Sequence, residues 1–577
     1  MKIRSLLEGR VNSALRKAGA PENSPALIQF ASRAELGDYQ ANGAIAAARK
    51  SGLGSREFAE IVIENLELSD IAESVTATGP GFINIRLSND WLCSQLGNMF
   101  QDERLGVKQS LTPETIVVDY SSPNLAKEMH VGHLRSSIIG DSVCRVLKFL
   151  GHNVIRQNHV GDWGTQFGML IAYIDHIKDK ENVNLSMMLA DLEEFYRAAK
   201  KLFDADENFA NTARQYVVQL QSGNAHCIEV WKHFIDVSLK HCEQIYEQLN
   251  IELSRKDVKP ESSYQDDLSR VIEDLKSVDL LTESDGAQCV FLDEFKGKDD
   301  KLVPLIVKKS DGGYLYATTD LAAIRYRANT LKADRILYFV DTRQKLHLKQ
   351  CFAVARQAGF VSDSCSLEHH AFGTMMGQDG KPFKTREGEN IKLVELLKEG
   401  KRRALEVLIE KDVTQEEKRQ EIADVVGIGA IKYADLSMNR ISNYVFSWEN
   451  MLSFEGNTAS YLLYAFARIK SIFRKAGLDN SMLKMALIIN EPAERSLAIK
   501  LLQFEDIIQT IAKECYPHIL CTYLYELAGV FMHYYEACPV IKASEPTRTS
   551  RLKLCLLTAN TMKCGLDLLG IKTIEQM

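Results

Sequence analysis

The order of apolar and polar residues predicts a small α/β unit at the start of the chain. An apolar run at residues 26–30 and an alternating run at 82–87 both predict strands. The alanine-rich stretch 44–50 between them predicts a helix. We therefore expect an N-terminal α/β domain over about residues 1–110.

Strand and helix patterns alternate in the middle of the chain. Strands are predicted at 116–120, 153–157 and 335–340, and helices at 132–150, 164–176 and 345–358. This alternation is typical of βαβ units and predicts a parallel sheet. A long, charged, helical stretch at about 180–255 predicts an insertion. Two further strands, 302–307 and 314–318, are expected around the turn Asp311-Gly312-Gly313.

The last third of the chain has a helical pattern nearly throughout. Residues 441–444 interrupt this pattern and predict a break between helices. The sequence therefore predicts an α/β chain of three domains: 1–110, a parallel-sheet domain at 111–395 with its insertion, and an all-α domain at 396–577.

Composition and charge narrow the class of protein. The 577 residues are 45% hydrophobic and 25% charged, which is typical of folded globular domains. The net charge of −7 means that a nucleic acid partner would have to meet local basic patches. The charged residues Glu8 and Arg10 stand where a secretory signal needs apolar ones, and no apolar run approaches the roughly 20 residues of a membrane span. We expect a cytoplasmic protein without a membrane segment.

The cysteines indicate a reducing compartment. The chain has 12 of them, scattered and without a CxxC pair. Zinc-site spacing is absent, so the pattern suits free thiols, and we expect no metal-binding residues and no structural metal.

The most informative segment surrounds two histidines. His130, Val131, Gly132 and His133 follow a predicted strand and Ser122-Pro123-Asn124, and they lead into a predicted helix. A strand, a tight turn with polar donors and a helix start is the arrangement that binds nucleotide phosphates. We expect the histidines to share one face of the first helical turn and to stabilise phosphate charge, with Gly132 leaving room for a base. Two ordinary surface histidines near a helix cap are the alternative.

Three more groups of residues carry candidate chemistry. The glycine-rich loop 377–386 contains Lys381 and Lys384, which can neutralise pyrophosphate; a solvated hairpin is the alternative. A second group combines carboxylates with an amide and consists of Glu261, Asp320 and Gln344. Asp320 could instead cap a helix, as an isolated aspartate often does. A third group has the spacing of one helix face and consists of Tyr461, Tyr464 and Arg468. These side chains could stack on unpaired bases, and ordinary packing against other helices is the alternative.

Motifs along the whole chain resemble those of the class I aminoacyl-tRNA synthetases, and specifically the bacterial-type arginyl-tRNA synthetases. HVGH at 130–133 matches the HIGH motif of the class, with Val131 in place of isoleucine. The prefix SPNLAK at 122–127 is typical of the arginine enzyme. Further matches follow in order: HVGDWGTQFG at 159–168, YLYATTD at 314–320, DTRQ at 341–344, KYADL at 432–436, FEGNT at 454–458 and GLDLLGI at 565–571.

The resemblance implies a Rossmann-type catalytic domain and a role for each matching residue. Pro123, Asn124 and the four residues of the HVGH motif would bind ATP. Asn124 and Gln344 would also hold the amino-acid end of arginine, and Tyr316 would lie against its side chain. Glu261 and Asp320 would bind the guanidinium, whose planar fork of donors suits two carboxylates.

Catalytic roles fall to the two histidines and to lysines. Lys381 and Lys384 would match the KMSKS loop, although KPFKT stands here in place of KMSKS. In some family members a lysine just before the histidine motif substitutes for a loop lysine, and Lys127 occupies that position.

The resemblance further implies that ATP, with Mg²⁺, and L-arginine form arginyl-adenylate, and that the arginyl group then moves to tRNA(Arg). The N-terminal domain would contact the D-loop elbow of the tRNA. The helical domain would read the anticodon through matching positions, which are Tyr461, Tyr464, Arg468, Tyr535 and Met577. We expect a monomer that needs tRNA for adenylate formation. The alternatives are a synthetase-like tRNA-binding protein without activity and a class I synthetase of another specificity.

Overall fold

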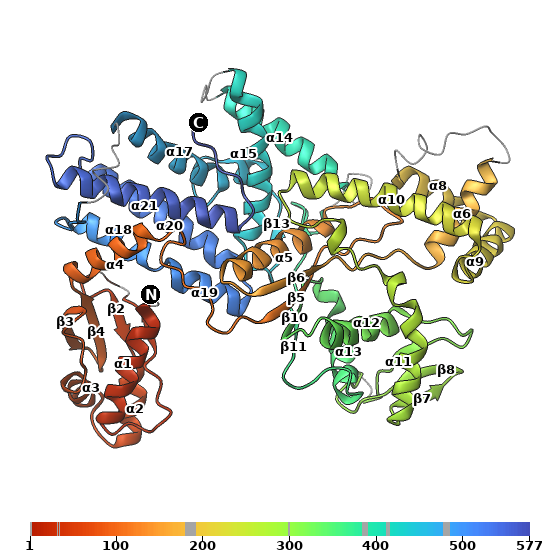
Figure 1. Ribbon diagram of the computed structural model, residues 1–577, viewed down its shortest axis with the longest axis horizontal. Helices are drawn as coiled ribbons and strands as arrows, with labels where there is room; N and C mark the ends of the chain where they lie inside the picture. Colours follow the sequence, from red (N-terminus) through yellow and green to blue (C-terminus); the bar gives the residue numbers. More distant parts are fainter. Residues whose placement is uncertain are drawn as a thin grey trace.

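The chain folds into an N-terminal unit, a central sheet with two inserted segments, and a set of C-terminal helices (Figure 1). The computed structural model describes residues 3–31, 33, 35–178, 192–297, 300–383, 391–410, 416–476 and 485–577. In Figure 1 the N-terminal unit lies at the lower left, beneath the C-terminal helices, and the helical insertion extends to the right. None of the described helices is long and apolar enough to cross a membrane.

The N-terminal unit is a four-stranded antiparallel sheet with helices packed against it. The strand order is β1-β2-β4-β3. Its elements are α1 (Ile3–Lys17), β1 (Ile28–Phe30), β2 (Tyr39–Ala41), α2 (Gly43–Ser51), α3 (Ser55–Glu64), β3 (Ala72–Thr78), β4 (Phe82–Leu87) and α4 (Asn89–Gln101). The predicted strands and helix are confirmed by β1, β4 and α2. The sequence AESVTAT of β3 carries little apolar signal, which is why the pattern did not predict this strand.

A buried arginine attaches this unit to the C-terminal helices. Arg495, on helix α18 (Pro492–Leu502), donates from Nη2 to Asp38 Oδ2 and to the Leu87 carbonyl, each at 2.7 Å. The Leu87 N–H also donates to Asp38 Oδ2 at 2.7 Å. One guanidinium therefore fixes the end of strand β4 against a helix some 400 residues away.

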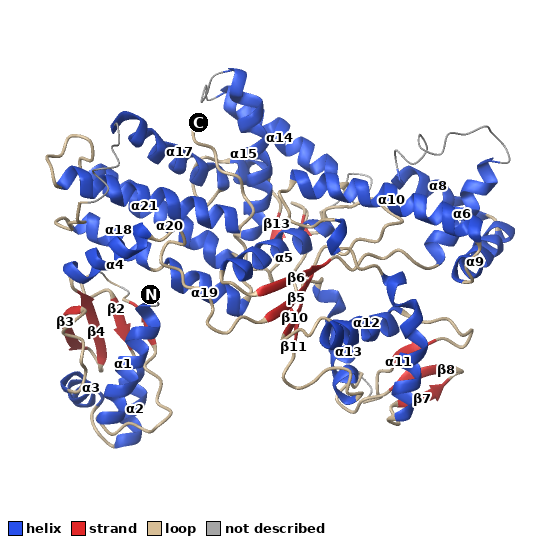
Figure 2. Cartoon of the chain, viewed as in Figure 1, coloured by secondary structure: helices blue, strands red, loops and turns tan. Residues whose placement is uncertain are grey.

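The central sheet is parallel, as the alternating pattern predicts. Its strand order is β11-β10-β5-β6, and each neighbouring pair is parallel. Figure 2 shows this sheet in the middle of the molecule, between the C-terminal helices and a separate small sheet. The strands are β5 (Thr115–Asp119), β6 (Asn153–Gln157), β10 (Arg335–Tyr338) and β11 (Ser366–His369), and the helices that follow β5, β6 and β10 are α5 (Gly132–Phe149), α6 (Thr165–Lys178) and α13 (Lys345–Gln357).

Two segments interrupt the parallel sheet between β6 and β10. The first is helical, as predicted, and consists of α8 (Leu192–Ala205), α9 (Glu207–Gln221) and α10 (Ala225–Gln248). The second is a three-stranded antiparallel sheet with helices, and consists of α11 (Gln265–Ser277), β7 (Leu281–Ser284), β8 (Ala287–Val290), β9 (Leu305–Lys308) and α12 (Tyr316–Arg325).

The strand predicted at 314–318 is wrong, because helix α12 begins at Tyr316. Beyond strand β9 the hairpin continues only as far as Leu315: Lys308 and Tyr314 form a bridge, and the Leu315 N–H donates to the Val307 carbonyl at 3.3 Å. The residues from Tyr316 onward bury Ala317, Leu321 and Ile324, a spacing that extends beyond the short window in which the run looks like a strand.

The C-terminal third is helical, as predicted. Its helices are α14 (Leu393–Glu410), α15 (Glu416–Leu436), α16 (Trp448–Leu452), α17 (Ala459–Ala476), α18, α19 (Phe504–Glu514), α20 (His518–Ala537) and α21 (Thr547–Leu568). The predicted break after α15 is confirmed. It contains the short strand β13 (Tyr444–Val445), which pairs in parallel with β12 (Met375–Met376) at the base of the loop that holds Lys381.

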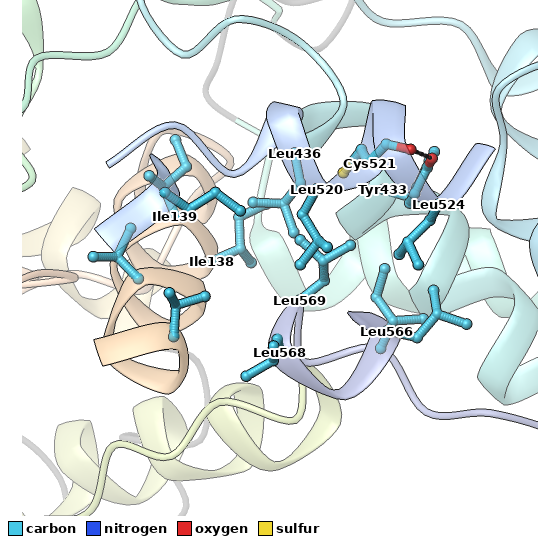
Figure 3. Close-up of a cluster of buried hydrophobic side chains, with 14 of the residues drawn as sticks. Ile138, Ile139, Tyr433, Leu436, Leu520, Cys521, Leu524, Leu566, Leu568 and Leu569 are labelled. Atoms are coloured by element: carbon cyan, nitrogen blue, oxygen red, sulfur yellow. Dashed lines mark hydrogen bonds between the residues drawn. The ribbon is translucent and has the colours of Figure 1, made fainter. Parts of the chain in front are cut away.

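Helix α5 of the central sheet packs directly into the C-terminal helices. Figure 3 shows Ile138 and Ile139 of α5 facing Leu436 of α15, with Leu569 beside them, in one buried cluster. Tyr433, also on α15, donates from its hydroxyl to the Cys521 carbonyl of α20 at 2.9 Å. The core is thus continuous across the two parts of the chain.

A buried ion pair joins the same two helices. Arg135 of α5 donates from Nε to Asp435 Oδ1 of α15 at 3.2 Å, and both side chains are almost completely buried. Arg135 Nη1 also donates to the Ser442 carbonyl at 3.0 Å, and its guanidinium lies 5.2 Å from the ring centre of Tyr444. Burial raises the pKa of Asp435 above its usual range. The pair therefore fixes helix α5 at a high desolvation cost, and loss of one partner would leave a buried charge uncompensated.

We expect Asp435→Ala to lower the free energy of unfolding by about 3–5 kcal/mol, the typical cost of breaking a buried pair. Glu421→Ala is the control, since Glu421 is exposed on the same helix and should change stability by at most about 0.5 kcal/mol. Urea denaturation followed by circular dichroism measures both variants. Equal midpoints for the two variants would contradict the role of the pair.

Candidate active site

The chain turns sharply at the end of strand β5, and two serines make this turn. Ser121 has a φ of 69° and Ser122 a φ of 45°, both in the left-handed region. The Ser121 N–H donates to Ser136 Oγ at 2.8 Å, and the Ser122 N–H donates to Asn158 Oδ1 at 2.9 Å. These bonds tie the turn to helix α5 and to the residue after β6. The chain that follows is held at the carboxyl edge of the parallel sheet, where such sheets bind ligands.

Pro123 and Asn124 lie beside the loop that follows strand β6. The Gly161 N–H donates to the Pro123 carbonyl at 3.1 Å, and the Leu125 N–H donates to the Gly161 carbonyl at 2.8 Å. The Asn124 side chain is exposed, and its Oδ1 accepts from the Ala126 N–H at 3.0 Å. The neighbouring backbone thus orients the Asn124 side chain at an exposed position on the sheet edge.

The two histidines lie side by side at the start of helix α5, but they do not share a helical turn. The helix begins at Gly132, so His130 precedes it, and the ring centres of His130 and His133 are 4.1 Å apart. The Gly132 N–H donates to His130 Nδ1 at 3.0 Å, and the His130 N–H donates to His133 Nδ1 at 3.1 Å. Because both Nδ1 atoms accept, the proton of each neutral ring is on Nε2.

Burial keeps both rings uncharged. Burial, and then the neighbouring His130, lowers the pKa of His133 to about 3. Burial also lowers the pKa of His130, with a further contribution from the positive charges of Lys127 and Arg343. The site therefore offers two neutral Nε2–H donors at neutral pH, which can bond to phosphate oxygens.

Gly132 is required by the histidine before it. A Cβ atom at this position would lie 2.7 Å from His130 Cε1, closer than real contacts allow. The exposed backbone of Gly132 thus makes room for the ring of His130 on one side. The approach of a base to Gly132 stays a prediction.

A pair of carboxyl groups lies near the sheet edge. One is in the segment between helices α10 and α11, beside the loop that follows β6, and the other is on helix α12. Glu261 begins a 3₁₀ turn, Glu261–Tyr264, and its N–H donates to the Val160 carbonyl at 3.1 Å. Burial raises the pKa of Glu261 to about 7, and the charges of Asp320 and then Asp162 add to this shift. In the described part of the chain no cationic side chain lies within ion-pair distance of Glu261. The pair can accept a cation from outside.

The alternative role of Asp320 as a helix cap is excluded. The cap position of helix α12 is Leu315, and Asp320 lies in the second turn. Its Oδ2 is 2.6 Å from His347 Nε2 on helix α13. The carboxylate therefore faces the space between the two helices.

Tyr316 and Gln344 lie at the starts of these same two helices. Tyr316 is 64% exposed, and its ring centre lies 4.9 Å from that of His347. Gln344 ends the 3₁₀ turn Thr342–Gln344, donates from its N–H to the Asp341 carbonyl at 3.0 Å, and has an exposed side chain. Tyr316 and Asp320 are thus both neighbours of His347.

The loop that holds Lys381 is a short hairpin with an exposed tip. The Gly377 N–H donates to the Lys381 carbonyl at 2.7 Å, and the Lys381 N–H donates to Asp379 Oδ1 at 3.1 Å. Phe383 anchors the hairpin by stacking on Phe446, with ring centres 4.4 Å apart. The Lys381 side chain is exposed. Lys384 lies outside the described residues.

Lys127 points toward the helical insertion. Its Nζ lies 4.4 Å from the ring centre of Tyr196 on helix α8, a cation–π distance. Its charge still contributes to the lowered pKa of His130. Lys127 is thus near the histidines, but its ammonium rests on an aromatic ring.

The aromatic stripe predicted in the helical domain is on the surface. Tyr464 and Arg468 of helix α17 are exposed. The Arg468 guanidinium lies 5.5 Å from the ring centre of Tyr535 on helix α20, and Tyr461 contacts Tyr525 edge-on at 5.6 Å. Met577 is partly buried against the apolar core. The stripe therefore continues from one helix to the next.

Comparisons with known proteins agree along the whole chain. Three family models match: "Arginyl tRNA synthetase N terminal domain" at residues 5–87, "tRNA synthetases class I (R), catalytic domain" at 95–448, and "DALR anticodon binding domain" at 462–577. Two curated relatives, both named arginine–tRNA ligase, come from Hahella chejuensis and a Marinomonas species. They are 57% and 54% identical to this chain, with full coverage of both proteins in each case.

The chain belongs to the arginyl-tRNA synthetases. Solved structures of this family have the same fold. The arginyl-tRNA synthetase of Plasmodium falciparum is 33% identical, with a TM-score of 0.86 over 100% of this chain and 99% of that one. The Thermus thermophilus enzyme is 25% identical, with a TM-score of 0.83 and full coverage of both chains.

A buried arginine that no pattern in the sequence indicates supports the strand ends of the candidate site. Arg327 lies in a short π-helical turn, Tyr326–Thr330, a type of element often found at functional sites. Its Nη2 pairs with Asp119 Oδ2 at 2.7 Å, and its Nε donates to Gln157 Oε1 at 2.7 Å. These partners are the last residues of β5 and β6. Arg327 thus holds the two strand ends from which the site loops begin.

The pKa of Glu261 predicts how arginine binding depends on pH. Below about pH 7 Glu261 is protonated in the free enzyme, whereas a bound guanidinium favours the ionised form. If Glu261 binds the guanidinium, as the sequence resemblance implies, arginine must displace this proton. The KM for arginine should then rise by up to about tenfold for each pH unit below 7 and level off above it. Glu261→Gln should bind arginine more weakly and without this dependence. Steady-state kinetics between about pH 6 and about pH 8 test this, and the same pH profile in both enzymes would contradict it.

Proposed function

We propose that this synthetase joins L-arginine to tRNA(Arg) through an arginyl-adenylate that forms at the start of helix α5. The half-buried carboxyl of Glu261 and the nearby carboxylate of Asp320 support arginine as the amino acid substrate. A guanidinium offers five donors in a planar fork, which two carboxylates satisfy, whereas the point charge of lysine does not. An amino acid without a matching donor group would leave the Glu261 carboxyl without a partner, at a cost of about 1–3 kcal/mol.

In the first step the arginine carboxylate attacks the α-phosphorus of ATP, and pyrophosphate leaves. The Nε2–H groups of His130 and His133 donate to phosphate oxygens as charge develops there. Lys381, on the hairpin that Phe383 anchors, and Lys384 stabilise the charge of the leaving pyrophosphate. Mg²⁺ arrives with ATP as part of the substrate.

Lys127 contributes less to charge stabilisation in this proposal than Lys381 does. Its ammonium rests on the ring of Tyr196, so contact with pyrophosphate requires it to leave that ring. The Lys381 side chain is exposed, and we assign it the larger share of the charge stabilisation.

Three residues orient arginine for the attack. Asn124 and Gln344, both exposed at the sheet edge, bind its amino-acid end. Tyr316 packs against its aliphatic part, since its exposed ring already lies against His347. Positioning of the two reactants replaces a side-chain nucleophile in this chemistry.

In the second step the 2′-OH of the terminal tRNA ribose attacks the activated carbonyl, and AMP leaves. We assign domain 1–110 to the elbow of the tRNA and domain 396–577 to the anticodon, with the catalytic domain 111–395 between them. Tyr461, Tyr464, Arg468 and Tyr535 would stack on unpaired anticodon bases, and Met577 would contact the anticodon near them. We further propose a monomer located in the cytoplasm, which sedimentation and fractionation can test.

ATP–pyrophosphate exchange tests the proposed reaction directly. With arginine and tRNA(Arg) present, the purified chain should exchange pyrophosphate into ATP and then form arginyl-tRNA. Without tRNA we expect little exchange. Exchange with a different amino acid would indicate a synthetase of another specificity, and tight tRNA binding without exchange would indicate an inactive relative.

We expect Tyr464→Ala to raise the KM for tRNA(Arg), because a stacked base contributes about 1–3 kcal/mol, or roughly 5–150-fold. The KM for arginine should stay within about twofold, since the two sites are in different domains. Tyr464→Phe is the matched control, as it keeps the ring. An equal loss in both variants, or no loss in either, would contradict stacking at this position; aminoacylation kinetics at varied tRNA concentration measure it.

A further inference from the structure

A carboxylate, an imidazole and a thiol converge between helices α12 and α13. His347 Nε2 lies 2.6 Å from Asp320 Oδ2 and 3.6 Å from Cys351 Sγ. The three donor atoms all lie within 4.8 Å of one another. His347 and Cys351 are four residues apart on helix α13, so they share one face of it.

The arrangement differs from a nucleophile triad. In a Cys-His-Asp triad the two ring nitrogens contact different partners, one toward the thiol and one toward the carboxylate. Here the same atom, His347 Nε2, faces both Asp320 and Cys351. One ring nitrogen carries at most one proton and can bond to only one of the two. Three lone-pair donors that face a common point are instead the geometry of a metal site.

We propose that Asp320, His347 and Cys351 bind a zinc ion, and that zinc and arginine exclude each other at Asp320. Zinc binds thiolate, imidazole and carboxylate with bond lengths of about 2.0–2.3 Å in a tetrahedron, which places its donor atoms roughly 3–4 Å apart. The Sγ–Nε2 distance already fits, and the Oδ2–Nε2 hydrogen bond opens when the ion replaces its proton. Magnesium and calcium prefer all-oxygen sites and do not suit a thiolate.

The ion reaches the site from the arginine side. Cys351 is completely buried, whereas the side chains of Asp320 and His347 are 22% and 18% exposed. The exposed ring of Tyr316 lies beside His347 at this opening. Three protein ligands leave the fourth position of the tetrahedron to water, as in zinc sites that exchange ligands.

The consequence is competition for one carboxylate. This part of the inference rests on the proposed role of Asp320 in binding the guanidinium. An ion on Asp320 Oδ2 neutralises the negative charge that arginine needs and occupies the space of its cationic group. Zinc should therefore raise the KM for arginine and leave kcat unchanged. Binding must also release the Cys351 thiol proton, since only the thiolate is a ligand.

The test compares the metal-free full-length enzyme with two cysteine variants. Cys351→Ala removes a ligand, and Cys365→Ala is the matched control, since Cys365 is also buried in the same apolar cluster. Cobalt(II) is the spectroscopic probe, because a thiolate–cobalt bond gives a charge-transfer absorption band. Zinc sulfate is then titrated into aminoacylation assays at several arginine concentrations.

The expected result is a cobalt–thiolate band and a zinc-dependent rise in the KM for arginine, in the wild type and in Cys365→Ala. Cys351→Ala should lose the band. Its inhibition constant for zinc should rise by more than roughly 10–100-fold, which is the loss of metal affinity when only a residue that supports a ligand is removed. Equal zinc inhibition of Cys351→Ala and the wild type would overturn the proposal.

Two other outcomes separate this inference from the proposed function. Absence of the band in the wild type overturns the metal site and leaves the arginine assignment intact. A Cys351-dependent band that saturating arginine does not displace overturns the competition, and with it the placement of arginine on Asp320.

Discussion

The buried ion pair between Arg135 and Asp435 fixes the position of helix α5, and the candidate active site is arranged around the start of that helix. The pair is almost completely buried, and the same arginine bonds to the Ser442 carbonyl beside strand β13. Strand β13 in turn pairs with β12, at the base of the Lys381 hairpin. One guanidinium therefore links the histidines, the lysine loop and the C-terminal helices. Packed apolar side chains also join helix α5 to the helical domain (Figure 3).

The opposite side of the site is held by a second buried arginine. Arg327 fixes the ends of β5 and β6 through Asp119 and Gln157. The histidines and Asn124 follow β5, and Glu261 is bonded to the loop after β6 through Val160. The proposed ATP side and the proposed arginine side of the site thus begin at two neighbouring strand ends with one common support. In the proposed reaction this common support would keep the two substrates in register for an in-line attack.

Local patterns in the sequence predicted most of the helices and strands. They did not predict contacts between residues that are far apart in the chain. The strand at 153–157, the strand at 82–87 and the helix after His130 were predicted almost to the residue, since each has a clear period and a clear boundary. The strand at 314–318 was wrong because five residues are too few to separate a strand from a helix start. Arg135 and Asp435 are 300 residues apart. His347 and Cys351 can be recognised as a candidate metal site only once the fold places them beside Asp320. Such contacts have no signal in a single sequence, whereas the motif residues could be found by resemblance.

The most direct test of this account is a crystal structure of the enzyme with a non-hydrolysable arginyl-adenylate analogue. The account predicts that the guanidinium lies between the carboxylates of Glu261 and Asp320, and that the Nε2 atoms of His130 and His133 lie within hydrogen-bond distance of the phosphate or of its substitute. A guanidinium bound away from Glu261, or histidines turned so that Nδ1 faces the ligand, would contradict it.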